Sequence, residues 1–311
     1  GGDPTHPDHG APAAGEIRRK IMRKYLSGLL ALVCLAGLSA CGRTHEVEKN
    51  PPPEEYRNLY TTQVQYTGED DPAQYLEIAA RSARLLAELE DKSGAFVADF
   101  YNYQSMDDNG TPLYTMNGLQ YPVEIDPNGM CIRVSKNYFQ HNPIETVDGQ
   151  DAAEQFVYDD LTLNVLVPEK YRDMETDIVA AYRDRFYFEK VEAENAYNRD
   201  AGLSARLDIP EEDLKINIIY VKDGQSYLSF RRDCARQTGG QVEDPVVQIY
   251  TANIHCNYAH SFMTQWVYFP SDAGDAEKAY QEVFPMIQTC GAQDSIQKVL
   301  SSDIAGTPEK R

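Results

Sequence analysis

The sequence predicts an α+β fold, with a mixed sheet or sheets against which helices pack. Two observations lead to this class: segments with helical periodicity and segments with strand character are mixed along the chain, and no internal repeat is visible. About 250 residues follow the amino-terminal segments, which is enough for one sizeable core or two smaller subdomains. We therefore expect the folded domain over residues 56–300 and a disordered tail over residues 301–311.

The first part of this domain is expected to hold a strand and then a long helix. Residues Leu59–Tyr66 alternate polar and apolar side chains, as strands do. Asp71-Pro72 is a typical helix start, the helix continues through Glu90, and Gly94 ends it. The expected buried stripe of this helix comprises Leu76, Ala79, Ala80, Ala83, Leu86 and Leu89.

Three strands are expected in the next part of the chain, at Ala95–Tyr103, Cys131–Val134 and Leu161–Val167. The last of these is apolar at all but two positions. Such a run indicates a central strand that is buried on both faces of the sheet. Pro168 follows directly and is expected to stop this strand.

A helix and a hairpin are expected after that strand. The helix begins near Arg172, but the pattern leaves open whether it reaches Tyr197, because Phe186–Val191 could also alternate as a strand. Lys215–Val221 and Gln225–Arg231 flank a Lys-Asp-Gly turn, which predicts a β-hairpin.

The carboxyl-terminal part is expected to contain two strands and a helix. Val246–Ile254 and Phe262–Phe269 are rich in branched and aromatic residues, which favours strands. Asp275–Thr289 has the period of an amphipathic helix, is interrupted by Pro285 and is ended by Gly291.

The chain is strongly acidic. It has 49 acidic and 29 basic residues among 311, a formal charge of −20 at pH 7, and removing residues 1–40 leaves −22. This charge repels phosphate backbones, which argues against nucleic-acid binding. It suits solubility at a cell surface, and it also suits a cationic partner such as a basic peptide.

Residues 22–41 resemble a bacterial lipoprotein signal. Two basic residues precede Tyr25–Gly37, an uncharged and mostly apolar run that is short for a bilayer crossing. Leu38-Ser39-Ala40-Cys41 then resembles a lipobox. In such signals the cysteine is diacylated and the chain is cut before it, so Cys41 is expected to become a lipidated amino terminus. An uncleaved transmembrane anchor is the alternative.

The segments around this signal are not expected to fold. Residues 1–21 precede the apparent start at Met22 and are treated as a non-native upstream extension, and residues 22–40 form the signal peptide. Residues 41–55 contain Pro51-Pro52-Pro53 and many charges, as a disordered, lipidated tether would. Extended, this tether would hold the domain about 40 Å from the membrane.

Five stretches occur in an order and spacing that resemble one known family. They are Val134–Ile144, Leu163–Tyr171, Phe186–Val191, Ile216–Lys222 and Glu243–Val247. Together they span most of the domain, and they resemble the extracytoplasmic domain of the bacteriocin-associated integral membrane proteins. Members of that family are proposed immunity proteins related to antimicrobial-peptide permeases.

The chain also departs from that family in one respect. Family members carry several membrane spans with this domain looped out between them, whereas here a lipid on Cys41 would replace the spans. The resemblance therefore implies association with an ABC system for peptide export or peptide resistance. It does not imply that this chain is itself a permease, and it brings no catalytic residues.

Four cysteines lie in the domain: Cys131, Cys234, Cys256 and Cys290. An even number outside the cytoplasm suggests two disulfides, with three pairings open. We expect at least one bridge among the last three, because they flank the carboxyl-terminal strands and helix. Four buried free thiols are the alternative.

His255, Cys256 and His260 form a group of donors that suit zinc. No H-E-x-x-H or C-x-x-C spacing accompanies them, so no metal is assigned. These three residues support only the alternative hypothesis, that the protein is an extracytoplasmic enzyme or metalloprotein. No G-x-S-x-G or P-loop motif is present either, so no catalytic residue and no cofactor are assigned.

Aromatic residues are abundant, with 21 tyrosines in the chain. Most of them are expected to face the core as strand residues. Tyr187, Tyr220, Tyr227 and Trp266 are nevertheless candidates for a recognition surface, because aromatic side chains are common in binding interfaces.

The leading hypothesis is a lipid-anchored protein on the outer face of the cytoplasmic membrane with a non-enzymatic binding or accessory role. The lipobox, the order of the family-like segments and the acidic charge together favour an ABC permease subunit or a cationic peptide as partner. The rivals are the enzyme or metalloprotein at His255–His260 and a purely structural envelope protein.

Overall fold

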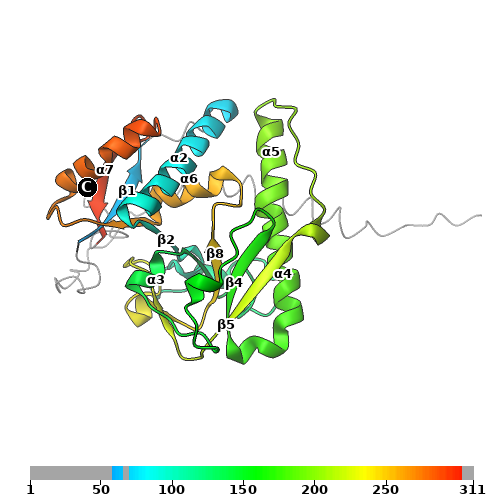
Figure 1. The fold of residues 1–311 in the computed structure, drawn as a ribbon. Helices are drawn as coiled ribbons and strands as arrows, with labels where there is room; N and C mark the ends of the chain where they lie inside the picture. The colour runs from blue at the N-terminus through cyan, green and yellow to red at the C-terminus, as the bar shows by residue number, and fades with distance from the viewer. Residues whose placement is uncertain (1–57, 66–69, 303–311) are drawn as a thin grey trace, which may run out of the picture. The chain divides into compact units, whose positions relative to one another are not determined.

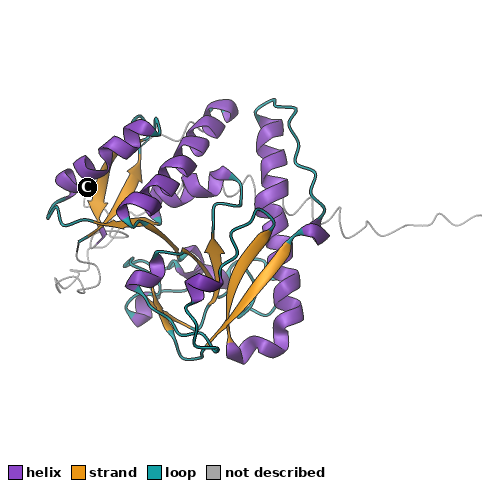
Figure 2. Ribbon diagram, viewed as in Figure 1, coloured by secondary structure: helices purple, strands orange, loops and turns teal. Residues whose placement is uncertain are grey.

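An eight-stranded sheet runs through the part of the chain that the computed structural model describes, residues 58–65 and 70–302. Its strand order is β10-β1-β9-β2-β3-β8-β4-β5. Figure 2 draws the strands in orange and the helices in purple. Within the sheet β3 pairs with β8, and β4 with β5, in parallel, while the other neighbours are antiparallel. The sheet is therefore mixed, and the predicted α+β class is confirmed.

The sheet draws its strands from all parts of the described chain. They are Leu59–Val64 (β1), Phe96–Asp99 (β2), Cys131–Ser135 (β3), Thr162–Pro168 (β4), Lys215–Val221 (β5), Val246–Tyr250 (β8), Val267–Pro270 (β9) and Ile296–Ser301 (β10). Ser226–Leu228 (β6) and Gln241–Glu243 (β7) form a separate two-stranded sheet. The sequence does not predict β10, which ends at Ser301, inside the segment expected to be a tail.

The helices lie in two groups (Figure 1). α2 (Pro72–Ser93), α6 (Cys256–Gln265) and α7 (Ala276–Thr289) pack together near β1 and β10, whereas α4 (Glu175–Tyr187) packs on β4 and β5 and continues toward α5 (Ala193–Asp200). The short α3 (Tyr138–His141) follows β3.

Helix α2 begins and ends where the sequence predicts. The Asp71 carboxylate accepts hydrogen bonds from the backbone N–H groups of Ala73 and Gln74, at 3.0 and 3.2 Å. Gly94 ends the helix at φ +68°, a left-handed conformation that glycine adopts without strain. The buried face comprises Ile78, Ala79, Ser82, Leu85, Leu86 and Leu89, so Leu76, Ala80 and Ala83 of the predicted stripe are only partly buried.

Strand β4 is buried along its whole length, as predicted. Leu163, Val165 and Val167 join the apolar cluster under α4, while Leu166 faces the larger cluster on the other side of the sheet. The side chains thus alternate between two clusters, as a strand covered on both faces requires. The described residues nevertheless belong to one compact unit.

One buried polar residue, Asn164, holds the chain that covers β4. Its Oδ1 accepts the backbone N–H of Val157 at 2.8 Å, and its Nδ2 donates to the carbonyl of the same residue at 2.9 Å. The Asn217 side-chain amide donates to the same Oδ1 at 2.8 Å. The amide group therefore makes three hydrogen bonds inside the core.

The helical segment after β4 extends beyond one regular α-helix. α4 passes through a π-helical segment, Phe188–Glu192 (η6), into α5, so the chain is helical from Glu175 to Asp200. The strand-like alternation of Phe186–Val191 therefore does not form a strand. A π-turn holds one extra residue and so redirects the side chains that follow it.

The predicted strand Phe262–Phe269 is wrong over its first half. Its first four residues belong to α6, and only Val267–Pro270 forms β9. Alternation alone does not separate these states over a short apolar run. Helix α6 forms because it buries Tyr258, Ala259, Phe262 and Met263 at helical spacing.

The predicted hairpin over Lys215–Arg231 is also wrong, although its turn exists. Gly224 adopts φ +75°, but the Asp244 carboxylate accepts the N–H groups of Gly224 and Gln225, each at 2.9 Å. This contact directs the chain away from β5, which pairs with β4, while β6 pairs with β7. Two other predicted strands are shortened, to Phe96–Asp99 and Val246–Tyr250.

Replacing Asn164 with alanine is expected to destabilise the fold by about 2–4 kcal/mol, because it removes the three hydrogen bonds of a fully buried side chain. Asn195 provides a matched control. It makes the same pair of bonds with Leu207, at 2.8 and 2.9 Å, but is only partly buried. Urea unfolding of N164A and N195A measures both losses, and an equal loss would contradict the role assigned to burial.

Candidate functional site

A row of polar side chains crosses three neighbouring strands in the middle of the sheet. Arg133 on β3 is the register partner of Asp99 on β2 and of Gln248 on β8. Register partners on neighbouring strands project from the same face, so these three side chains lie side by side. From the sequence, Arg133 is only one residue of a strand. A single arginine in an apolar run does not indicate which side chain it will pair with.

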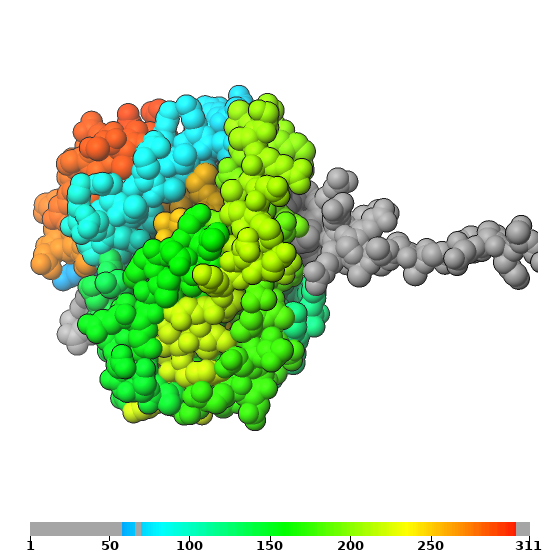
Figure 3. All heavy atoms as spheres, turned by 45° about the vertical axis from the view of Figure 1, so that its right-hand side comes forward, coloured from blue at the N-terminus to red at the C-terminus, as the bar shows by residue number. Residues whose placement is uncertain are grey.

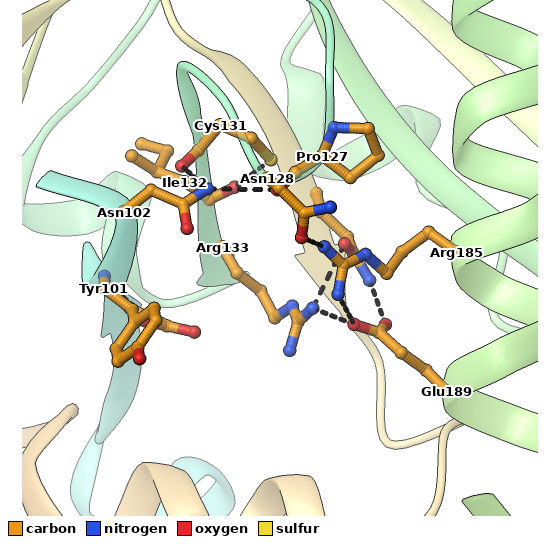
Figure 4. Close-up of polar contacts among 11 residues, drawn as sticks. Tyr101, Asn102, Pro127, Asn128, Cys131, Ile132, Arg133, Arg185 and Glu189 are labelled. Atoms are coloured by element: carbon orange, nitrogen blue, oxygen red, sulfur yellow. Dashed lines mark hydrogen bonds and ion pairs between the residues drawn. The ribbon is translucent and has the colours of Figure 1, made fainter. Parts of the chain in front are cut away.

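Glu189 of η6 reaches this row and completes it (Figure 4). Its carboxylate is fully buried and accepts hydrogen bonds from Arg133 and from the Gln248 amide, the latter at 2.7 Å. Nη1 of Arg185, one turn earlier on α4, lies 3.7 Å from the same carboxylate, and Arg185 also donates to the Asn128 side chain. The buried charge is thus balanced inside the protein.

The same network ties α6 to the sheet. The Arg133 guanidinium lies over the rings of Tyr258 and Phe262, 5.4 Å from each centroid. The backbone carbonyl of Glu189 accepts the N–H of His255, just before α6, at 3.0 Å. Burial raises the pKa of Asp99, and the neighbouring Arg133 opposes that shift. We read this polar network as the part that positions α4, η6 and α6 on the sheet.

His255 and Cys256 form a second cluster at the start of α6. The His255 imidazole stacks on Tyr197 with a centroid distance of 4.8 Å, and its Nε2 lies 3.6 Å from a Glu194 carboxylate oxygen. The Cys256 sulfur lies 3.9 Å from the same Nε2. His255 also caps α6, because its Nδ1 accepts the N–H of Asn257 at 3.2 Å.

The electrostatics of this second cluster disfavour an activated thiol. Burial, followed by the nearby Glu194 carboxylate, raises the pKa of Cys256 to about 11. Burial also lowers the pKa of His255, although Asn257 and Glu194 act in the opposite direction. The thiol and the imidazole are therefore both neutral near pH 7, so this pair does not favour the rival enzymatic role.

The third residue of the expected zinc group lies elsewhere on α6. Nδ1 of His260 is 2.8 Å from the Ser82 hydroxyl on α2, so this histidine joins two helices. The rings of Tyr75 and Tyr197 stand between it and His255. Within residues 58–65 and 70–302, no group of three or more His, Cys, Asp or Glu side chains is placed to hold a metal ion.

All four cysteines of the described domain are free thiols. The expected bridge among Cys234, Cys256 and Cys290 is therefore wrong. Cys131 and Cys234 belong to different apolar clusters, and Cys256 lies at the start of α6 while Cys290 follows α7.

Two of the four aromatic surface candidates are in the core. Tyr227 is 0 % and Trp266 2 % exposed, so their assignment to a recognition surface is wrong. Trp266 ends α6 and stacks under the Arg231 guanidinium, 4.6 Å from its centroid. Tyr187 and Tyr220 are partly exposed, and Tyr220 donates its hydroxyl to Glu175.

A cavity of about 360 Å³ lies at the end of the sheet that β5 forms. It is lined by Phe139, Pro143, Ile144, Glu145, Thr146, Gly149, Gln150, Asp151, Ala152 and Lys222. Phe139, Pro143, Ile144 and Ala152 make it partly apolar, and Glu145 and Asp151 bring exposed carboxylates to it. We call these ten residues the edge cavity. Its volume suits one or two side chains of a ligand.

The edge cavity is held in place by hydrogen bonds to β5. The N–H of Val147 donates to the carbonyl of Tyr220, and the N–H of Lys222 donates to the carbonyl of Glu145, each at 2.9 Å. The Gln225 amide adds a bond to the same carbonyl at 3.0 Å. A segment without regular secondary structure is thereby fixed at the edge of the sheet.

One ion pair lies at the mouth of the edge cavity. Lys222 Nζ is 2.5 Å from a Glu145 carboxylate oxygen, and this contact lowers the pKa of Glu145. Hydrogen bonds from the Gln150 N–H and the Thr146 hydroxyl lower the pKa of the adjacent Asp148. These carboxylates are therefore ionised throughout the neutral range.

Glu90, near the end of α2, is a further buried ionisable group. Its Oε1 is buried without a hydrogen-bond partner in the described part of the chain. Burial raises the pKa of Glu90 to about 7, and the Ser135 hydroxyl opposes the shift. This carboxyl group therefore changes its protonation near neutral pH.

Comparison of the chain with protein-family models, with curated proteins and with solved structures finds no match. Among the described residues no helix is both long and apolar enough to cross a membrane. Cys41 and the predicted segments 1–21, 22–40 and 41–55 lie outside the described residues.

Glu189→Gln is expected to destabilise the protein by about 3–5 kcal/mol, because it removes the fully buried charge that pairs with the largely buried side chains of Arg133 and Arg185. Glu194→Gln is the matched control on the same helical segment. Its carboxylate is 38 % exposed, so a change within about 1 kcal/mol is expected. Denaturant unfolding of both variants measures the difference, and similar losses would contradict the central role of Glu189.

Glu90→Gln is expected to stabilise the protein at pH 8 and to have little effect at pH 5. The folded-state pKa of about 7 lies above the ordinary 4.5, so ionised Glu90 destabilises the fold as pH rises through this range. Glu88→Gln, on the exposed side of the same helix, serves as control. Melting temperatures at both pH values test this, and a pH-independent gain would contradict it.

Proposed function

We propose that this protein is a surface lipoprotein, anchored through Cys41 outside the cytoplasmic membrane, that binds cationic amphipathic peptides. It works beside an ABC permease for the export of such peptides or for immunity to them. The role is non-enzymatic: the chain captures or presents a peptide, and the permease moves it.

The edge cavity is the observation that carries this proposal. An amphipathic cationic peptide presents apolar and basic side chains close together. The cavity offers both kinds of contact, with Phe139, Ile144 and Ala152 for an apolar side chain. For a basic side chain it offers the carboxylate of Asp151 and that of Glu145, which Lys222 already contacts. The Phe139 ring is backed by Phe156 at a centroid distance of 6.0 Å, so the apolar wall is continuous with the core.

The overall charge supports the same class of ligand. A formal charge of −20 attracts cations over a distance of about one Debye length, roughly 8–10 Å at physiological salt. Several described basic side chains are already paired with carboxylates, among them Arg133, Lys170, Lys190 and Arg231. Exposed carboxylates therefore dominate the field that an approaching peptide meets.

The link to a permease rests on the sequence. The lipobox at Leu38–Cys41 would hold the domain near the membrane, and the five family-like stretches resemble a domain that other proteins carry between membrane spans. One of these stretches, Val134–Ile144, contributes Phe139, Pro143 and Ile144 to the edge cavity.

Binding of a synthetic lysine–leucine peptide to the full chain, measured by calorimetry at low and high salt, tests the proposal. The double variant Glu145→Gln, Asp151→Asn should bind up to about tenfold more weakly at low salt, because two attractive charges are lost. Both replacements keep a side-chain acceptor, so the Asp151 cap on Ala153 and the contact with Lys222 remain available.

The matched control is the double variant Asp272→Asn, Glu277→Gln, which removes two exposed charges near α7, away from the cavity-lining residues. It should bind nearly as well as the parent protein. Absence of binding by the parent protein, or an equal loss in both double variants, would overturn the proposed site.

A further inference from the structure

Strand β5 is the last strand of the sheet, and its outer edge is only half covered. The bond from the Lys215 N–H to the carbonyl of Leu161, at 2.8 Å, sets the register with β4. In a parallel ladder alternate residues of a strand face opposite neighbours. Residues 215, 217, 219 and 221 therefore bond to β4, and the backbone groups of Ile216, Ile218 and Tyr220 point to the outer edge.

The chain itself occupies one end of this edge. Residues 145–147 pair with Tyr220 and Lys222 as a short antiparallel segment. Gly149, at φ +75°, then turns the chain away. Among the described residues the outward N–H and C=O groups of Ile216 and Ile218 have no hydrogen-bond partner. In the space-filling view the yellow segment that contains β5 reaches the surface between two green segments (Figure 3).

We propose that this open edge of β5 takes an extended segment of a cationic peptide as an added strand. The inference rests on the proposed peptide-binding function and specifies the conformation of the ligand. The backbone groups of Ile216 and Ile218 would supply the hydrogen bonds that give affinity. The edge cavity lies beside them, because Glu145 and Thr146 belong to the segment that already pairs with β5.

The charges around the edge favour a cationic strand over a second copy of the chain. Asp148 and Asp151 follow the segment that covers one end, and Glu212 and Asp213 lie just before β5 at the other. All four are exposed, as are Lys215 and Lys222 at the two ends of β5. Lys222 is already paired with Glu145, so acidic side chains are in excess. Pairing two copies edge to edge would bring these carboxylates together, whereas a basic peptide neutralises them.

Ile218→Pro is the direct test, because proline removes the outward N–H of this residue without removing a donor to β4. The bonds to β4 come from the neighbouring positions, and proline is tolerated where a strand N–H faces outward. Binding of a peptide of alternating lysine and leucine should weaken about tenfold, as expected for lost backbone hydrogen bonds. Ile218→Val changes the side chain but keeps the N–H, so it should bind as the parent does. Circular dichroism of both variants verifies the fold.

A second peptide separates this inference from the proposed function. An isomer with the same lysines and leucines arranged at helical period has equal charge and apolar content but does not form a two-sided strand. The alternating peptide should bind several-fold more tightly. If both isomers bind equally well, and Ile218→Pro binds them as the parent protein does, the added-strand inference is wrong. The proposed peptide-binding function would then still hold.

Two further outcomes complete the test. If neither peptide binds, the proposed function fails and the added strand fails with it. If sedimentation without peptide shows a dimer of the parent chain that Ile218→Pro abolishes, the edge serves pairing between copies, and the peptide assignment is wrong.

Discussion

The structure depends on how one buried carboxylate is neutralised. Glu189 has no exposed surface and would destabilise the core by several kcal/mol if it stood alone. Arg133 from the sheet, Arg185 from the preceding turn and the Gln248 amide satisfy it from three elements. Because each partner comes from a different part of the chain, the network forms only when β3, β8, α4 and η6 are all in place. The charge thereby specifies one arrangement of the helices on the sheet.

That arrangement also determines where the candidate binding site lies. Helix α4 covers one face of β4 and β5, and β5 is the terminal strand of the sheet. The segment around Glu145 then pairs with part of its free edge and forms the edge cavity. Within the described part of the chain, the outward backbone groups of Ile216 and Ile218 on this terminal strand have no hydrogen-bond partner. Recognition at such an edge needs no catalytic group.

Prediction from the sequence succeeded where a signal is local. Asp71 and Gly94 mark the two ends of α2, because a side-chain cap and a left-handed glycine act within one helical turn. Strand β4 is recognised by its long apolar run. It failed where two states share one pattern: Phe262–Phe269 alternates, yet the packing of Tyr258 and Phe262 makes half of it helical. Of the candidate site, the sequence indicated acidic charge and the stretch that holds Phe139, but not Arg133 or the cavity, because their partners are far away in the chain.

The sequence by itself determined helix α2, strand β4 and the acidic character of this protein, and it predicts a lipid anchor at Cys41. All of these follow from the composition and order of neighbouring residues. Only the tertiary structure decided that the cysteines stay unpaired, that Tyr227 and Trp266 are buried, and that Lys215–Val221 is the last strand of the sheet and not half of a hairpin. The physical reason is the same in each case. Distance, burial and strand pairing are set by contacts such as Asp244 with Gly224, which join residues far apart in the chain.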